Sequence, residues 1–174
     1  MTATHETLQK LFVTGLVNIH AVEKQALAIA SPQVARLEHY PELADRIRLH
    51  IDETDSQIAR AEEALAQFDT SASRLKDTAL SMSGSMAAIT HSIAGDEVLK
   101  NSYANYAFEH FEIASYRSLL TLAEDGGFDR ATPLLQQSLS EEEAMAQWLG
   151  DALPTITRRY AALYAEEGVS TAKA

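Results

Sequence analysis

The sequence contains no cysteine, and this absence removes several chemical classes at once. Without a thiol, the chain cannot form a disulfide, a thiolate nucleophile, a zinc ribbon, an iron–sulfur cluster or a rubredoxin-type iron site. Any metal ion that this chain binds would therefore be held by oxygen and imidazole ligands.

Glycine, proline and positive charge are also scarce. The 174 residues include 7 Gly and 4 Pro, and 46% are hydrophobic, which suits one globular domain with a single core. With 14 basic against 25 acidic residues the formal net charge is −11, which disfavours nucleic acid and anionic membranes as partners. No run approaches the ~18 apolar residues of a membrane span, and MTATHETLQK has no basic segment followed by an apolar one. We therefore expect a cytoplasmic protein with no nucleic-acid or membrane partner.

Helix-forming residues dominate the sequence. Ala, Leu, Glu, Gln and Lys are abundant and alternating β-branched runs are missing, so the sequence predicts helices and no strands. Apolar residues recur at steps of three and four along four long segments. These segments run from Thr4 to about Ala30, from Pro41 to about Phe68, from about Asp96 to Glu124, and from about Asp129 to Ala152. Two short helices are expected as well, one from Ser73 to about Ile89 and one after Pro154.

This arrangement predicts an all-α protein with a ferritin-like four-helix bundle, a long crossover and a short fifth helix. Short loops within each half and one long connection between the halves are typical of that fold. The two halves also echo each other, because Glu23 precedes Glu53 by 30 residues and Glu109 precedes Glu142 by 33. We expect one bundle domain over residues 1–165 and a flexible tail over residues 166–174.

Each long helix places a carboxylate near the middle of its inner face. An unpaired buried carboxylate costs several kcal/mol, and residues three apart share one helical face, so each such pair could reach the same ion. Five carboxylates would bring a charge of −5 into the core, and two divalent cations would return +4. The predicted metal ligands are Glu23, His50, Glu53, Glu109, Glu112 and Glu142.

The ligand types indicate which metals suit such a site. Zinc usually takes fewer carboxylates and calcium prefers flexible loop ligands, whereas an oxygen-rich site with imidazole on rigid helices suits iron or manganese. The sequence therefore predicts two metal ions, iron as the first choice and manganese as the second.

Two ligand assignments have alternatives. His50 could be a core histidine, because its spacing to Glu53 reverses the usual Glu-x-x-His order of di-iron bundles. Glu141 is the alternative to Glu142, which is preferred because leucines lie seven positions on either side of it. Any single glutamate of the set could also be a solvated or salt-bridged surface residue, and only the joint placement on four helices favours a site.

Other residues near the predicted site are expected to play lesser parts. His20 lies three positions before Glu23 but beside the inner face, which favours a partner or boundary residue over a ligand. Tyr103, Tyr106 and Tyr116 could line the site, although aromatic packing in the core is the simpler interpretation.

Four segments resemble a known family. HAVEKQAL, YPELADRIRLHIDETDSQI, AFEHFEIASYRSLL and LSEEEAMAQWL are similar, in order and spacing, to the bacterial YciE/YciF family of small ferritin-like stress proteins, with the closer match to YciE. The resemblance extends from about Leu8 to Ile156. It implies a ferritin-like bundle with a short fifth helix, a homodimer, and a di-metal centre on the six residues named above.

The resemblance and the inner carboxylates together suggest a stress-response protein with a di-iron or di-manganese centre that reacts with peroxide or dioxygen, with Glu53 or Glu112 as the bridging ligand. An electron donor would be external, because the chain lacks the rubredoxin iron of rubrerythrins. A dimer also lacks the cavity that bulk iron storage needs. The alternative is a non-enzymatic metal-binding or structural homodimer. An oxygenase acting on an organic substrate would need an apolar channel to the metals.

Overall fold

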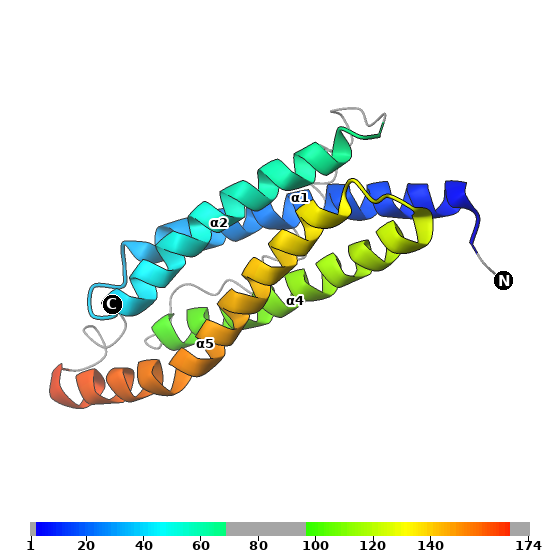
Figure 1. Cartoon of the computed structure of the whole chain (residues 1–174). Coiled ribbons are helices and arrows are strands. Elements are labelled where there is room, and N and C mark those ends of the chain that lie inside the picture. Colours follow the sequence, from blue (N-terminus) through cyan, green and yellow to red (C-terminus); the bar gives the residue numbers. More distant parts are fainter. Residues whose placement is uncertain (1–2, 69–96, 168–174) are drawn as a thin grey trace.

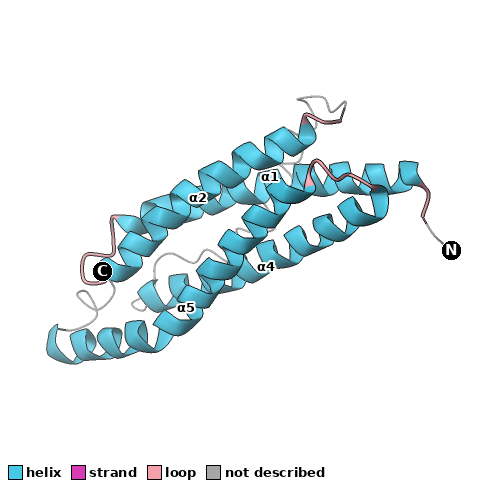
Figure 2. Cartoon of the chain, in the orientation of Figure 1, coloured by secondary structure: helices cyan, strands magenta, loops and turns pink. Residues whose placement is uncertain are grey.

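The computed structural model describes residues 3–68 and 97–167, and all regular secondary structure in these two ranges is helical (Figure 2). The four helices are α1 (His5–Val34), α2 (Pro41–Leu65), α4 (Glu97–Gly126) and α5 (Thr132–Glu167). The predicted all-α class is therefore confirmed. The short helix expected from Ser73 to about Ile89 lies outside the described residues. No described helix has the length and apolar character that crossing a membrane requires.

The helices form two hairpins that pack side by side (Figure 1). α1 packs against α2 and α4 against α5, while α1 also contacts α4 and α2 also contacts α5. In Figure 1, α2 and α4 run in the same direction, so the end of α2 and the start of α4 lie at opposite ends of the bundle. This connectivity is that of a ferritin-like bundle with one long crossover.

Local sequence signals explain three of the helix ends. The Thr4 side chain accepts a hydrogen bond from the Thr7 backbone N–H at 3.3 Å and caps α1. Pro41 occupies the first turn of α2, where its missing N–H costs nothing. Gly127 follows α4 with a φ of 69°, the left-handed conformation that ends many helices.

Two prolines do not end helices as the sequence predicts. α1 continues through Pro32, and α5 continues through Pro154 to Glu167, so the predicted separate fifth helix is instead the end of α5. A proline inside a helix costs about 3 kcal/mol. Ile156 and Leu163, beyond Pro154, are buried in an apolar cluster, and this packing opposes that cost. Figure 1 shows α5 changing direction in its orange part. The tail expected from residue 166 begins inside this helix, and residues 168–174 are outside the described ranges.

The core consists of two apolar clusters with buried polar residues between them. One cluster gathers around Phe12, Leu16 and Leu119, and the other around Ile47 and Leu149. On α1 the buried members of the first cluster end at Val22, and on α2 they begin at Ala61. The turn of α1 at Glu23 and the turns of α2 between Ile47 and Ala61 therefore face a polar layer. That layer contains the glutamates and the histidine predicted to bind metal.

Gly127 offers a direct test of the turn that sets α5 against α4. A Cβ added there would meet nothing within 4 Å, so the cost of Gly127→Ala is the strain of the left-handed backbone alone. We expect Gly127→Ala to lower the free energy of unfolding by about 1 kcal/mol. Gly127→Asn should lose less, since asparagine tolerates this conformation. Denaturant unfolding measures both, and an alanine variant as stable as the parent would contradict the assignment.

Candidate metal centre

Three side chains from three helices meet in the polar layer. His50 of α2, Glu109 of α4 and Glu142 of α5 each offer a ligand atom within 4.8 Å of the others. His50 Nε2 lies 3.2 Å from Glu109 Oε2 and 3.7 Å from Glu142 Oε2. All three residues are buried, with Glu142 completely inaccessible to solvent. An imidazole and two carboxylates at these distances are a donor set suited to a divalent cation.

Glu23 and Glu112 adjoin this group. Both are fully buried, Glu23 on α1 and Glu112 one turn after Glu109 on α4. The Tyr116 hydroxyl donates a hydrogen bond of 2.5 Å to Glu23 Oε1, which leaves Oε2 without a hydrogen-bond partner among the described residues. Neither oxygen of Glu112 has such a partner in the same ranges.

Glu142 is held from one side by an amide. Gln57, which is fully buried on α2, donates one hydrogen bond to Glu142 Oε1 and another, of 3.1 Å, to Glu141 Oε2. Arg60 pairs with Glu141 and donates a 3.0 Å hydrogen bond to the Ser138 hydroxyl. Glu141 therefore serves an ion pair at the edge of the layer, while Glu142 Oε2 faces the layer without a hydrogen-bond partner among the described residues.

Glu53 takes a different position from the other glutamates. Its side chain is 23% exposed, and its Oε2 lies 3.0 Å from Arg46 Nη1 and 3.0 Å from His50 Nδ1. This carboxylate thus orients the imidazole ring, so that Nε2 points toward Glu109 and Glu142. A carboxylate on the far nitrogen of a metal-binding histidine commonly fixes that ring in the same way.

Burial dominates the electrostatics of the layer. Desolvation raises the pKa of Glu23 to about 7, although the Tyr116 hydrogen bond opposes the change. Desolvation, together with the neighbouring carboxylates, also raises the pKa values of Glu112 and Glu142 well above the usual range. Burial alone would lower the pKa of His50, but its bonds to Glu109 and Glu53 outweigh burial and raise the value to about 10.

The carboxylate at the edge behaves in the opposite way. Burial would raise the pKa of Glu53, but its hydrogen bonds to His50 and Arg46 lower the value below the usual range. Without a bound cation, the layer is therefore stabilised by protons on Glu112, on Glu142 and on the His50 imidazole, while Glu53 remains ionised.

The residues present fit a metal centre by a simple criterion. Buried polar atoms are almost always hydrogen-bonded, because leaving one unpaired costs about 1–3 kcal/mol. The atoms that break this rule within the described part of the chain are both oxygens of Glu112, one oxygen each of Glu23, Glu109 and Glu142, and the amide oxygen of Gln57. Divalent cations would supply the missing partners, and oxygen with imidazole is the donor set of iron and manganese sites.

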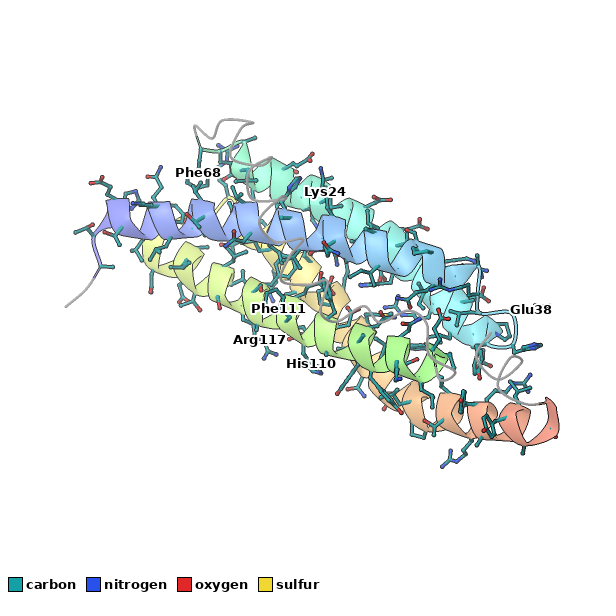
Figure 3. The ribbon with its side chains drawn as sticks, turned by 180° about the vertical axis from the view of Figure 1, so that it is seen from behind. Lys24, Glu38, Phe68, His110, Phe111 and Arg117 are labelled. Carbon is teal, nitrogen blue, oxygen red and sulfur yellow. The ribbon has the colours of Figure 1, made fainter. Side chains whose placement is uncertain are left out.

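The predicted inward face is confirmed for most of the site residues. Burial agrees for Glu23, His50, Glu109, Glu112 and Glu142, and Glu142 rather than Glu141 is the inaccessible residue of its pair. Glu53 is the exception, since it lies at the edge on Arg46. α4 also has an exposed face: Figure 3 shows His110 and Arg117 extending outward from it, and both residues are exposed.

The neighbouring residues follow the sequence interpretation less closely. His20 is buried but its Nε2 lies 2.9 Å from Glu62 Oε1, which joins α1 to α2 at the boundary of the layer. Tyr116 lines the site, which was one of the two possibilities given for it, since its hydroxyl donates a hydrogen bond to Glu23. Tyr103 is 50% exposed, so neither core packing nor lining of the site holds for it. Tyr106 is partly buried and packs against the second apolar cluster, as core packing predicts, and its ring also meets His110 edge-on.

Sequence reasoning missed two residues that hold the glutamates in place, Gln57 and Arg60. A usable signal existed for Gln57, because residues 50, 54, 57 and 61 follow the same steps of four, three and four along the inner face of α2. Ile58, the apolar residue beside Gln57, is only partly buried. Arg60 gave no comparable signal, since its reach to α5 depends on the packing of two helices distant in sequence.

Known proteins are similar to this chain in both sequence and fold. Residues 7–162 match the family described as a domain of unknown function, DUF892. Protein YciF of Escherichia coli is 32% identical over 147 residues, which cover 80% of this chain and 86% of that protein. A crystal structure of a Xanthomonas campestris protein has a TM-score of 0.76 at 30% identity, covering 91% of this chain and 99% of its own.

The structure of the E. coli stress protein YciF superimposes with a TM-score of 0.72 at 23% identity, covering 87% of this chain and 98% of that one. These relatives support the expected resemblance at the level of the family. The closer match to YciE stays a prediction.

The raised pKa values predict how stability depends on pH in protein kept metal-free with chelator. A group whose pKa is higher in the folded state stabilises it below the unfolded pKa, and loses that contribution as pH rises through the folded value. For Glu23 the window runs from 4.5 to about 7, and the shift is worth on the order of 3 kcal/mol. His50, with values of 6.5 and about 10, extends the same trend upward.

We therefore expect the melting temperature of the metal-free protein to fall as the pH rises from 5 to 8. Glu23→Gln should flatten this slope, because amides do not titrate, and Glu124→Gln on the exposed surface of α4 should leave it unchanged. Thermal unfolding followed by circular dichroism measures all three proteins. A parent melting temperature that rises over this interval would contradict the assigned directions.

Proposed function

The chain belongs to the DUF892 family, and we propose that it is a two-metal carboxylate protein. Its bundle would hold two iron ions, or two manganese ions as the second choice. One observation carries the proposal: carboxylate oxygens from three helices are buried around one point without hydrogen-bond partners among the described residues. The charge balance supports it, since two divalent cations nearly neutralise the carboxylates without requiring them to take up protons.

Three of the proposed ligands each have one atom already fixed by the protein and another available. Tyr116 holds Glu23 through Oε1, Gln57 holds Glu142 through Oε1, and Glu53 holds His50 through Nδ1. The atoms left over are Oε2 of Glu23, Oε2 of Glu142 and Nε2 of His50. Such outer contacts orient ligands before an ion arrives and reduce the entropy lost when it binds.

Glu112 is the better candidate for the bridging ligand. Both of its oxygens are without hydrogen-bond partners among the described residues, so it can offer one to each of two ions. Glu53 is less suited, because Arg46 and His50 already occupy its Oε2 and a bridge would have to compete with them. Glu109, one turn away from Glu112, completes the contribution of α4.

When bound, such ions would supply Lewis acidity and redox chemistry. The chain's own residues contribute the surroundings. Metal binding would displace the protons that His50 Nε2, Glu112 and Glu142 carry in the metal-free protein, so metal affinity should increase with pH. The Tyr116 hydroxyl holds a proton at Glu23 Oε1, and the apolar clusters on either side keep water from the layer.

We propose that the reaction partner is dioxygen or peroxide, in the setting of a stress response. YciF of E. coli, a relative of this chain, is described as a stress protein. An electron donor has to come from outside, because the chain has no cysteine for a second iron site. We also propose that the chain is more similar to YciE than to YciF.

A second candidate function is a structural bundle without bound metal. The observation in its favour is the internal compensation of charge: His50 pairs with Glu53 and Glu109, and Arg46 pairs with Glu53. In this candidate Glu53 and Glu109 stay paired with His50, while the other inner glutamates remain protonated and fix the register of the helices. The two candidates make opposite predictions for metal content and for the effect of chelator on the melting temperature.

Metal binding should stabilise the fold measurably. An ion that binds only the native state contributes ~2.7 kcal/mol at 100 times its dissociation constant, so chelator should lower the melting temperature of protein purified without it. Glu142→Gln keeps the acceptor for Gln57 but removes one charge, so it should lose metal affinity. Its metal-free form should be at least as stable as the metal-free parent, because the amide is neutral in the buried layer without taking up a proton.

Glu143→Gln is the matched control, since Glu143 lies next in sequence but is exposed and pairs with Arg117. It should bind metal as the parent does. Elemental analysis, titration with Fe(II) under anaerobic conditions and melting curves with and without chelator give the three readouts. Metal-free parent protein whose melting curve is unaffected by Fe(II), Mn(II) or chelator would support the structural bundle instead.

We also propose that the chain forms a homodimer. The resemblance to the YciE/YciF family implies a homodimer, and five large apolar side chains of the described residues, each about half exposed, are available to form part of the contact. They are Leu11, Leu49, Tyr103, Phe111 and Tyr164. Light scattering at micromolar concentration should give twice the chain mass of 19.0 kDa. Replacing Phe111 by serine tests whether α4 contributes to the contact, and a monomeric mass for the parent would contradict the dimer.

A further inference from the structure

A narrow cavity leads from the junction of α1 and α4 to the candidate metal centre. Half-buried residues form its outer part: Ala26, Ile29, Ala30, Ala104 and Asn105. Buried residues form its inner part, and among them are His50 and Glu109. Exposure therefore decreases along the cavity from the bundle surface to two of the three clustered ligand atoms.

The size of the cavity limits what can enter. Its volume is about 30 Å³. A water molecule needs at least ~10–15 Å³ of such space, so the cavity has room for a molecule of about two heavy atoms. Organic substrates occupy pockets of roughly 300–1,000 Å³. An oxygenase that brings an organic molecule to the metals through this route is therefore disfavoured.

The chemistry of the wall limits the entrant further. Ile47, Phe108 and Met145 give the inner part an apolar surface. The Thr54 hydroxyl is already engaged, since it donates a 2.8 Å hydrogen bond to the His50 carbonyl within α2. A molecule moving inward thus meets no strong hydrogen-bonding group in this part until it reaches His50 and Glu109.

The one amide in the wall is engaged as well. Asn105 and Gln33 exchange two hydrogen bonds of 3.0 and 3.2 Å between α4 and α1. This reciprocal pair fixes the separation of the two helices at the outer part of the cavity. It also satisfies the Asn105 groups that could otherwise hold a polar molecule there.

From this geometry we infer that the cavity is the entry route for dioxygen to the metal centre. An uncharged apolar diatomic molecule fits the volume and loses no hydrogen bonds on entering. Hydrogen peroxide would have to give up its hydrogen bonds to water, and a hydrated cation would have to give up its hydration shell, each at considerable cost. The inference rests on the proposed function, and it selects dioxygen over peroxide as the small molecule that this route serves.

Xenon provides a test that requires no bound metal. Xenon occupies dry apolar cavities, so crystals of the metal-free protein under xenon pressure should show it between α1 and α4. Ala104→Leu should fill the space and abolish the xenon site, and Ala30→Leu does the same from α1 if the first variant fails to fold. Ala107→Leu is the matched control, because Ala107 lies on the same helix but is exposed and outside the cavity.

Kinetics on the iron-loaded protein provide the second readout. Ala104→Leu should slow Fe(II) oxidation by dioxygen on the order of tenfold, with Fe(II) affinity and the rate with peroxide unchanged, while Ala107→Leu changes neither rate. Equal slowing with peroxide would overturn the choice of dioxygen. If the protein binds metal, but crystals of the parent contain no xenon and Ala104→Leu does not change the oxidation rate, then the route alone is overturned. Xenon in a protein that binds no metal would instead overturn the proposed function.

Discussion

Desolvation of carboxylates in the middle of the bundle is the constraint on which the rest of this structure depends. Four glutamates, Glu23, Glu109, Glu112 and Glu142, are no more than 4% exposed. Each would be destabilising as an isolated ion in such surroundings. Tyr116, the buried Gln57 amide and the His50 imidazole contact these glutamates, but they satisfy only part of the carboxylate oxygens. The layer therefore has to carry either protons or cations, and its charge state links stability to whatever occupies it.

Helical periodicity was sufficient for the class of fold and for the side of each helix that faces inward. The spacing of Leu16, Ile19 and Glu23 on α1, for example, identifies a stripe that is buried as expected. The seven-residue phase on α5 distinguishes Glu142 from its neighbours Glu141 and Glu143. Burial of a whole face depends on a repeat along one helix, which a single sequence displays directly.

Features that depend on two helices at once could not be obtained in this way. Arg46 draws Glu53 to the edge of the layer, and Arg60 reaches Glu141 across the α2–α5 contact. Which rotamer a side chain adopts depends on neighbours that periodicity does not place. Pro154 shows a related limit, because the local preference to end a helix there yields to apolar contacts made by residues further along α5. Local rules fail where tertiary packing outweighs them.

The division of the core into two apolar clusters also bears on how this family can diverge. Substitutions that are far apart and share no partners have nearly additive effects on stability. Leucine, isoleucine and valine in either cluster can therefore drift with compensation only among their own neighbours. The polar layer lacks this freedom, since replacing one glutamate alters the charge balance of every other member. We therefore expect the residues of the two apolar ends of the bundle to vary within the family, whereas those in the central turns of all four helices change together or remain fixed.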